Sequence, residues 1–349
     1  MEAFPIGGPG ARLPVTVVTG FLGAGKTTLL RHLLLHSGQR LAVLVNEFGE
    51  VGIDGDLIAS CGFCPEEELE GRLVELANGC LCCTVQDEFL PTMERLLARA
   101  DRLDGIVVET SGLALPEPLV AAFGWPTIRT RTRVNAVVTV VDGEALAAGH
   151  VVGDASAVEA QRRADPSLDH LTALEDLFAD QLEAADLVLV SRADLLAPEE
   201  LEAVRGRLNP HLRSGTTVLL MARGSIDPQV VLAAAAPCAG SGATHHDDHH
   251  HHAHAAMESL VVRRSGHWER EVLERQLRSL LADHPVVRLK GRLHQSGKRL
   301  PLQIQAVGPR LECWYEGGGA RQDDAPRLEL VVLGAAADAE RLAAAFATI

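Results

Sequence analysis

The sequence has no hydrophobic run long enough to cross a membrane. No stretch approaches the roughly 20 consecutive apolar residues that a spanning helix needs, so we expect no membrane partner. The first residues, MEAFPIGGPG, lack the basic region and the apolar core of a secretory signal. We therefore expect a cytoplasmic protein, in which clustered cysteines more often bind metal or do redox work than form structural disulfides.

Positive charge is also scarce. Lys and Arg number 32 against 47 Asp and Glu, which gives a formal net charge of −15 at pH 7. We expect no nucleic-acid partner, because neutralising phosphates requires clustered Lys and Arg. The length of 349 residues, with 47% hydrophobic and 23% charged residues, is typical of a globular protein with room for two domains.

Short apolar runs rich in Val alternate with amphipathic stretches through the first two thirds of the chain. The runs are LPVTVVT (13–19), LAVLV (41–45), GIVVE (105–109), AVVTVV (136–141), DLVLV (186–190) and TVLLM (217–221). Such runs are typical of buried parallel strands. The stretches between them are helical: TTLLRHLLLHS is one, and EFLPTMERLLARA is another, with one face made of Phe89, Leu90, Met93, Leu96, Leu97 and Ala100. The alternation predicts an α/β domain, with a doubly wound, mostly parallel sheet, over residues 12–232.

The composition changes after residue 232. Residues 233–256 have no apolar periodicity and predict a flexible linker, and residues 257–349 combine strand-like runs with two helical stretches, which predicts a smaller C-terminal α+β domain. Within the linker, HHDDHHHHAH (245–254) carries seven of the fifteen histidines. Imidazoles bind Co²⁺, Ni²⁺ and Zn²⁺ with little selectivity, so we expect a weak metal buffer. An inert polar linker is the alternative; a purification tag is disfavoured by the internal position.

A phosphate-binding loop follows the first predicted strand. GFLGAGKTT matches G-x-x-x-x-G-K-T and leads into a predicted helix. Glycines let the backbone N–H groups face the phosphates, Lys26 reaches the β- and γ-phosphates, and Thr27 offers its hydroxyl to Mg²⁺. A later strand ends on Glu109, whose carboxylate can hold Mg²⁺ through water. We take Lys26 and Glu109 as the candidate catalytic residues.

Guanine is the favoured base. SRADLL follows a predicted strand and keeps the aspartate of the N-K-x-D pattern, as Asp194, while Ser191 and Arg192 replace its Asn and Lys. An aspartate there accepts the two N–H groups of the guanine edge, which adenine lacks. A helix cap is the alternative role of Asp194. The predicted nucleotide-binding residues are Gly20, Phe21, Leu22, Gly23, Ala24, Gly25, Lys26, Thr27, Thr28, Ser191, Arg192 and Asp194.

Three of the seven cysteines lie within four positions, in ELANGCLCCTV. Cys80, Cys82 and Cys83 cannot all turn inward to pack, and adjacent cysteines make a poor structural disulfide. The start of the next predicted helix favours thiolates, so metal binding is the favoured interpretation, with buried free thiols as the alternative. A second pair, Cys61 and Cys64, makes a four-cysteine zinc site a further alternative.

These motifs resemble those of a known family. VTGFLGAGKTTLLRHLL, VNEFGEVGIDGDLI, ELANGCLCCTV and VVETSGLALPEPLVAAFGWP are similar to the CobW-type metallochaperone GTPases, a group that includes the nickel-insertion GTPases of urease and hydrogenase maturation. The resemblance covers nearly the whole chain, and is strongest to the family's cobalamin-biosynthesis member.

That resemblance implies a slow GTPase that handles Co²⁺ for the cobaltochelatase of aerobic cobalamin synthesis. It also implies that Cys80, Cys82 and Cys83 form the metal motif, with Cys82 the most dependable ligand. Glu47, Glu50 and Asp54 fall in the expected nucleotide-sensing switch, and Glu50 is expected near the metal or the attacking water. A zinc chaperone of the same family and a regulatory GTPase with structural zinc are the alternatives, and a nucleotide-dependent dimer is a further hypothesis.

Thiolates alone would not select cobalt, because the affinity of a sulfur-rich site rises from cobalt towards copper and zinc. The sequence therefore suggests that bound Mg²⁺–GTP orders the 46–54 and 80–83 loops together and that hydrolysis releases the metal.

Overall fold

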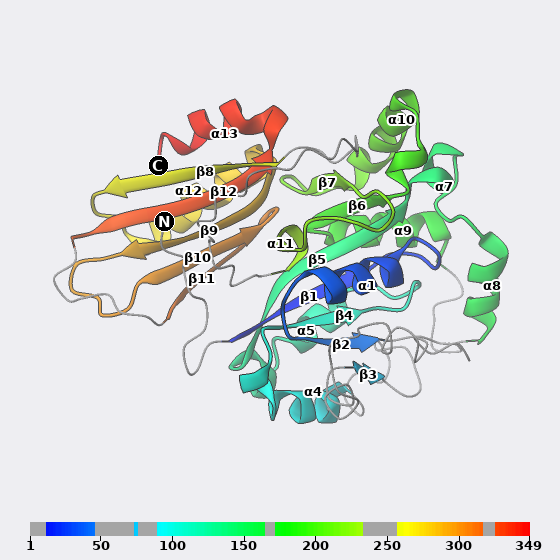
Figure 1. Cartoon of the computed structure of the whole chain (residues 1–349), viewed down its shortest axis with the longest axis horizontal. Coiled ribbons are helices and arrows are strands. Elements are labelled where there is room, and N and C mark those ends of the chain that lie inside the picture. The colour runs from blue at the N-terminus through cyan, green and yellow to red at the C-terminus, as the bar shows by residue number, and fades with distance from the viewer. Residues whose placement is uncertain (1–11, 46–72, 76–88, 165–171, 233–256, 317–324) are drawn as a thin grey trace, which may run out of the picture.

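The computed structural model describes residues 12–45, 73–75, 89–164, 172–232, 257–316 and 325–349. Figure 1 shows the described elements as two sheets, each with its own helices. None of the described helices is long and apolar enough to cross a membrane. The strands of the first part are β1 (Leu13–Thr19), β2 (Leu41–Val45), β3 (Leu73–Glu75), β4 (Gly105–Glu109), β5 (Thr132–Asp142), β6 (Leu187–Ser191) and β7 (Thr217–Leu220). Its α-helices are α1 (Lys26–His36), α4 (Leu90–Leu97), α5 (Glu117–Ala122), α6 (Pro126–Arg129), α7 (Gly143–Ala147), α8 (Ala155–Ala164), α9 (Leu174–Ala184), α10 (Pro198–Leu208) and α11 (Pro228–Val231).

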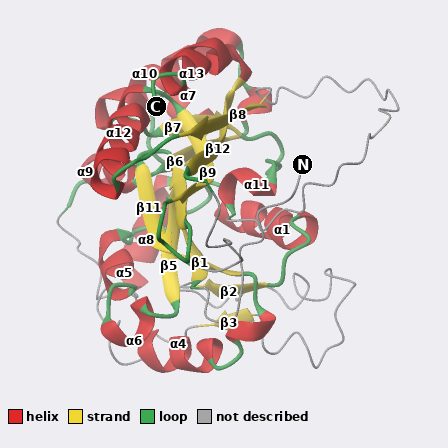
Figure 2. Ribbon diagram, turned by 90° about the vertical axis from the view of Figure 1, so that its left-hand side faces the viewer, coloured by secondary structure: helices red, strands yellow, loops and turns green. Residues whose placement is uncertain are grey.

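The first sheet has the order β3-β2-β4-β1-β5-β6-β7, and all of its neighbouring strands run parallel. Figure 2 shows α1 and α11 on one side of these strands and α5, α6 and α9 on the other. The predicted doubly wound α/β fold is confirmed. The register pairs Glu109 at the end of β4 with Val18 of β1, and Asp142 at the end of β5 with Ser191. The last residues of several strands therefore meet at one edge of the sheet.

The side chains of a central strand belong alternately to two separate hydrophobic cores, one on each face of the sheet. In β1, Val18 packs in the core that contains Leu29 and Leu33 of α1, whereas Val15 and Val17 pack in the core that contains Met93. This is the period of two that a strand imposes on its side chains. The predicted apolar face of α4 is confirmed, because all six of its residues belong to or pack against the second core: Phe89, Leu90, Met93, Leu96, Leu97 and Ala100.

The C-terminal part is the predicted α+β domain. Its antiparallel sheet has the order β11-β10-β9-β12-β8. On helix α12, Leu273, Leu277 and Leu281 recur every four residues and are fully buried against the sheet. The elements are β8 (Met257–Ser265), α12 (Arg270–Asp283), β9 (Val286–His294), β10 (Leu302–Val307), β11 (Arg310–Tyr315), β12 (Arg327–Ala335) and α13 (Ala339–Phe346).

The C-terminal domain contacts the end of the first sheet where the strands begin. Arg288 of β9 donates to Asn135 Oδ1 of β5 at 2.9 Å, and to the carbonyl oxygens of Gln229 (2.9 Å) and Val230 (3.2 Å). Arg133 of β5 lies 4.5 Å from the ring centroid of Trp314. Burial lowers the pKa of Arg288 to about 9 and that of Arg133 to about 10. These contacts lie where the strands begin, at the end of the sheet opposite the edge where the strands end.

Candidate functional site

The phosphate-binding loop connects the end of β1 to the start of α1. Gly20 has φ 129°, and a Cβ there would lie 2.1 Å from the carbonyl oxygen of Val140, so this position tolerates no side chain. Gly25 has φ 106° and occupies the N-cap position of α1 in a left-handed conformation. The N–H groups of the first turn of α1, which have no acceptor within the helix itself, thus lie at the strand-end edge, where a phosphate can accept them.

The two candidate catalytic residues lie together. Lys26 Nζ donates to the carbonyl oxygen of Phe21 at 3.2 Å and lies 3.8 Å from Glu109 Oε1. Both side chains are buried. The parallel pairing of β1 with β4 explains this meeting, because it places Glu109 beside the strand that leads into the loop. A cation and a carboxylate at a helix N-terminus suit a metal-bound triphosphate.

The donor atoms near this pair suit magnesium. Thr27 follows Lys26 in the first turn of α1 and is half-buried. Its hydroxyl and the carboxylate of Glu109, at the end of β4, are two oxygen donors close to Lys26 in the chain or in space. Hard oxygen donors of this kind are the ones Mg²⁺ prefers. Two glycines pack closely against the phosphate loop. A Cβ on Gly224 would lie 2.3 Å from Thr28 Cγ2, and a Cβ on Gly112 would lie 2.6 Å from Leu22 N.

The predicted base-binding loop begins where β6 ends. The Ser191 hydroxyl donates to the carbonyl oxygen of Val141 at 3.1 Å. Arg192 has φ 55°, and its guanidinium hydrogen-bonds Asp142, lies 3.5 Å from Glu144 Oε2, and donates to the carbonyl oxygen of Gly23 at 3.2 Å. The hydrogen bond to Asp142 raises the pKa of Arg192. Arg192 therefore connects the base-binding loop to the phosphate loop.

Asp194 is exposed and faces the loop after β7. Its Oδ1 accepts the backbone N–H of Arg223 at 3.3 Å, and Arg223 Nε lies 3.8 Å from its Oδ2. The alternative role of helix cap does not hold. Helix α10 begins at Pro198, and the backbone N–H before it, on Ala197, donates to Glu200. The carboxylate lies shortly after the end of β6, at the strand-end edge, and is contacted by Arg223.

Several candidate residues lie outside the described part of the chain: Glu47, Glu50, Asp54, Cys61, Cys64, Cys80, Cys82, Cys83 and the histidines of 245–254. Among the described residues, no group of three or more His, Cys, Asp or Glu side chains is arranged to hold a metal ion. The strands that lead into these segments are described, however. Val45, the last residue of β2, pairs with Glu109 on one side and with Glu75, the last residue of β3, on the other.

Sequence reasoning did not single out Asp142 or Gln181. Asp142 caps α7 by accepting from Glu144 N and Ala145 N, and it holds Arg192. The available signal was the same as for Glu109, a carboxylate that ends an apolar Val-rich run. Gln181 of α9 is fully buried and donates to the carbonyl oxygens of Gly112 and Ala114, which fixes the loop after β4. No local pattern marks that residue.

Two family models match the chain. The model described as CobW/HypB/UreG, nucleotide-binding domain, matches residues 14–219, and the model described as cobalamin synthesis protein cobW C-terminal domain matches residues 257–349. The chain belongs to the CobW family of GTPases. The resemblance drawn from the motifs and the expected GTPase class are confirmed at this level.

Curated relatives carry names that refer to zinc. The zinc chaperone CobW of Pseudomonas aeruginosa is 46% identical over 340 residues, which cover 95% of this chain and 90% of the relative. The zinc chaperone CobW of a Sinorhizobium species is 41% identical over 332 residues and covers 93% of both chains. Among solved structures, the Zn(II)-bound YjiA GTPase of E. coli aligns over 97% of this chain and 98% of its own, with 24% identity and a TM-score of 0.41.

Proposed function

We propose that this CobW-family GTPase is a metal chaperone whose cargo is Zn²⁺, and that its nucleotide state sets the metal affinity of Cys80, Cys82 and Cys83. The observation that supports this proposal is the alignment of strand ends. Val45, Glu75 and Glu109 are neighbours in three adjacent parallel strands. The spacing of strands in a sheet puts Glu75 roughly 10 Å from Glu109, the candidate magnesium and catalytic residue.

The chain distances from these strand ends to the candidate metal and switch residues are short. Glu47 stands two residues after Val45, and Cys80 stands five residues after Glu75. Five residues span at most about 17 Å of extended chain. The segments 46–54 and 76–83 therefore both start beside the residues that contact the phosphates in our proposal. A γ-phosphate that orders one segment can for this reason change the other.

The chemistry we assign follows from charge. Lys26 and the N–H groups of the first turn of α1 bind the triphosphate, and Asp194 accepts the guanine edge. Mg²⁺, held by Thr27 and Glu109, compensates the charge of the β- and γ-phosphates when bound. Neutralising that charge reduces the electrostatic repulsion between the triphosphate and nearby thiolates. Hydrolysis removes the γ-phosphate and with it the contact that holds the segments in order, so the metal passes to an acceptor protein.

Zinc is the first choice of cargo for two reasons. Thiolate sites bind Zn²⁺ more tightly than Co²⁺, and the two relatives above are named zinc chaperones. Cobalt delivery to a cobaltochelatase is the second candidate, favoured by the C-terminal family model, which is described by cobalamin synthesis. The acceptor, magnesium and the roles of individual site residues are part of the same proposal.

Competition between the two metals tests the choice. The chain is loaded with Mg²⁺ and a GTP analogue that resists hydrolysis, and Zn²⁺ is titrated against bound Co²⁺ while the cobalt–thiolate absorption is followed. The zinc proposal predicts displacement by a single equivalent of Zn²⁺. Retention of Co²⁺ against excess Zn²⁺ would overturn the zinc proposal and favour the cobalt candidate. As a control for recognition of the guanine base, Asp194→Asn should weaken the binding of GTP and strengthen the binding of a xanthine nucleotide.

A further inference from the structure

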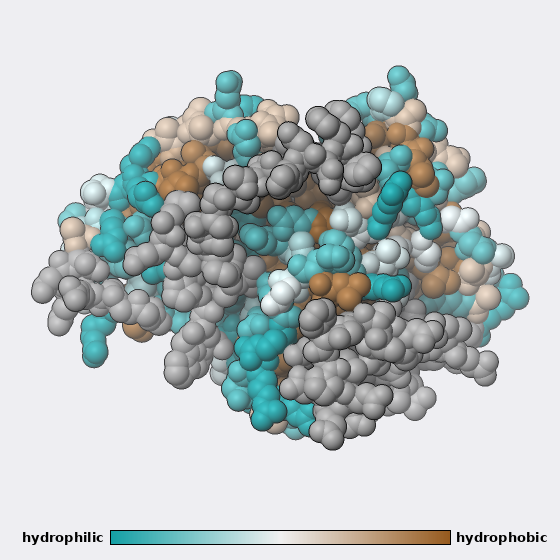
Figure 3. Space-filling view, in the orientation of Figure 1, coloured by the Kyte–Doolittle hydropathy of each residue, from teal (hydrophilic) through white to brown (hydrophobic). Residues whose placement is uncertain are grey.

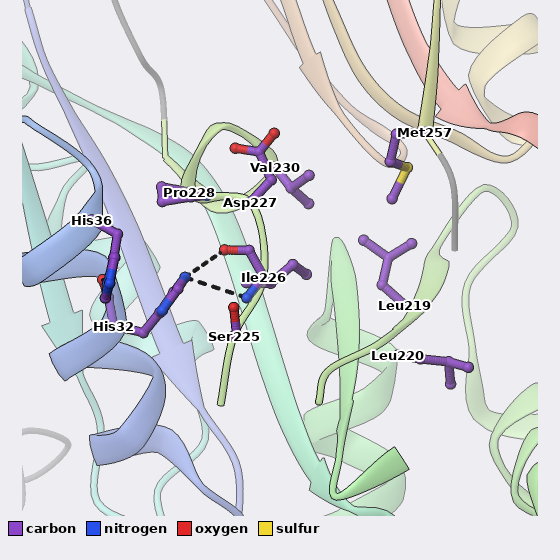
Figure 4. A pocket seen from close by; sticks show the side chains of 10 residues that line it. All are labelled: His32, His36, Leu219, Leu220, Ser225, Ile226, Asp227, Pro228, Val230 and Met257. Atoms are coloured by element: carbon purple, nitrogen blue, oxygen red, sulfur yellow. Dashed lines mark hydrogen bonds between the residues drawn. The ribbon is translucent and has the colours of Figure 1, made fainter. Parts of the chain in front are cut away.

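A cavity of about 470 Å³ lies at the end of α1 that is remote from the phosphate loop. Residues of α1, β7, the loop before α11 and the start of β8 line it, among them His32, His36, Ile226, Asp227 and Met257. Figure 4 shows the two histidines side by side on α1, facing the loop that carries Ile226. The helix runs from Lys26 to His36, so about 15 Å of α1 separate this cavity from the candidate nucleotide site.

The two imidazoles form a stacked pair. Their ring centroids are 4.5 Å apart with an interplanar angle of 23°. His32 is half-buried and His36 is exposed. A neutral imidazole always has one bare nitrogen that can bind a metal ion.

Backbone carbonyls determine which nitrogens are bare. His32 Nε2 lies 2.7 Å from the carbonyl oxygen of Ile226 and 3.4 Å from its nitrogen. The shorter contact decides the tautomer, because only an N–H can approach a carbonyl oxygen so closely. His36 Nδ1 lies 3.0 Å from the carbonyl oxygen of His32 and so donates to it. When the rings are neutral, Nδ1 of His32 and Nε2 of His36 are therefore the nitrogens that carry a lone pair.

This arrangement is the one that metal-binding histidines use. A ligating imidazole commonly donates its other N–H to a carbonyl, which fixes the tautomer and raises the basicity of the ligand nitrogen. Histidines at i and i+4 on one helix face form a recurrent pair of zinc ligands. Here both features occur in the same pair, at the mouth of a cavity that can admit a hydrated cation.

The histidine-rich stretch lies close to this cavity along the chain. His254, the last histidine of the histidine-rich stretch, stands three residues before Met257, which lines the cavity. Three residues span at most about 11 Å. Cations held weakly by that stretch would therefore be present at a high effective concentration beside the cavity.

We propose that His32 and His36 form a second site for a divalent cation that prefers imidazole, of the Zn²⁺, Co²⁺ and Ni²⁺ class. Each ring contributes its bare nitrogen while its other nitrogen keeps the hydrogen bond to a carbonyl oxygen, and water completes the coordination, because no third side chain joins them among the described residues. With only two imidazole ligands, the site is expected to be weaker than a thiolate site. It stands whether or not the nucleotide controls the cysteine motif.

The test compares His36→Gln with His211→Gln. His211 is exposed and far along the chain in the turn after α10, so its replacement controls for the general loss of a surface imidazole. Both changes are made in the full-length chain with Cys80, Cys82 and Cys83 replaced by Ser, with and without the additional deletion of 245–254. Zn²⁺ alone is titrated calorimetrically, and the thermal midpoint without metal is recorded for each protein.

We expect His36→Gln to remove one equivalent of Zn²⁺ in both backgrounds, and His211→Gln to leave the zinc stoichiometry unchanged. His32→Gln should remove the same equivalent. Equal zinc stoichiometry in the His36 and His211 variants would overturn the site. Loss with His32→Gln alone, accompanied by a lower midpoint without metal, would assign His32 a packing role through Ile226 and would also overturn it.

Discussion

Two aspartates that precede strands provide a matched test of how burial sets the strength of an ion pair. Asp186 precedes β6, accepts the backbone N–H of Val137 at 2.7 Å and lies 2.9 Å from Arg213 Nη2. Asp104 precedes β4, accepts the backbone N–H of Arg40 at 2.8 Å and lies 2.9 Å from Arg40 Nη2. The distances match, but the Asp186 side chain is 0% exposed and that of Asp104 is 37% exposed.

Asp186 also joins the two domains, because Arg310 of β11 hydrogen-bonds its Oδ2. Asp186→Ala removes the carboxylate that two guanidinium groups and a buried N–H share, although Arg213 keeps the carbonyl oxygens of Ala184 and Ala185. Removing one partner from a buried pair costs about 3–5 kcal/mol. Asp104→Ala breaks an exposed pair, which contributes about 0.2–1 kcal/mol, and one backbone hydrogen bond of similar size. We expect the free energies of unfolding of the two variants to differ by about 3 kcal/mol.

The assay is urea unfolding followed by tryptophan fluorescence and circular dichroism, with each transition fitted separately because a two-domain chain can unfold in steps. Added salt should weaken the Asp104 pair and leave the Asp186 pair nearly unchanged. Arg310→Ala should cost less than Asp186→Ala, because Arg213 and Val137 still satisfy the carboxylate. Equal losses in the Asp186 and Asp104 variants would refute the burial argument.

Three further changes have expected outcomes. Lys26→Ala should abolish Mg²⁺-dependent GTP hydrolysis, and it should also lower the thermal midpoint, because it removes one partner of the buried ion pair with Glu109; retained phosphate release would remove Lys26 from the site. Gly20→Ala should lose nucleotide binding, measured with a fluorescent GDP, because the new Cβ would meet the carbonyl oxygen of Val140 at 2.1 Å; near-normal affinity would show that the loop can shift. Partial burial raises the pKa of Cys313 to about 12, so the thiol should stay protonated in the folded chain and react slowly with iodoacetamide up to about pH 9, whereas in urea it should react at the ordinary rate; fast labelling of folded Cys313 would contradict the raised pKa.

Much of the fold could be predicted because it rests on local periodicity. The Val-rich runs predicted five strands of the first sheet to within one residue, the run at 136–141 missed the first four residues of β5, and the spacing of apolar residues predicted the buried face of α4. Strand β3 could not be found this way, since Leu73–Glu75 is too short to show a period. The described face in Figure 3 likewise mixes hydrophilic and hydrophobic residues, so its colouring alone would not have located the site.

The site could be predicted only where a motif has fixed spacing. Lys26 and Thr27 follow from the glycine pattern, and Glu109 from its position at the end of a strand. The pairing of Asp142 with Arg192 could not be predicted, because it joins residues 50 positions apart. The contact of Arg288 with Asn135 spans 153 positions and depends on how two domains meet. The division into domains at residues 232 and 257 and the metal role of the cysteines remain predictions.

The central claim is that the nucleotide controls the metal. If GTP tightens metal binding at Cys80, Cys82 and Cys83, linkage requires the metal to tighten GTP by the same factor. Typical couplings of about 1–3 kcal/mol correspond to roughly 5- to 150-fold, and we expect a value near the upper end, because the nucleotide is proposed to assemble the site. Cys82→Ser should abolish the difference and leave metal-free GTP binding nearly unchanged.

The most direct measurement is a metal titration of the full chain with Mg²⁺ and a GTP analogue, with Mg²⁺ and GDP, and without nucleotide. Co²⁺ serves as the probe through its thiolate absorption, and Zn²⁺ is measured by competition. The account predicts the tightest binding in the GTP-analogue state for both metals, with the difference lost in Cys82→Ser. Equal affinity in all three states would leave a GTPase beside a static metal site and would contradict the chaperone proposal.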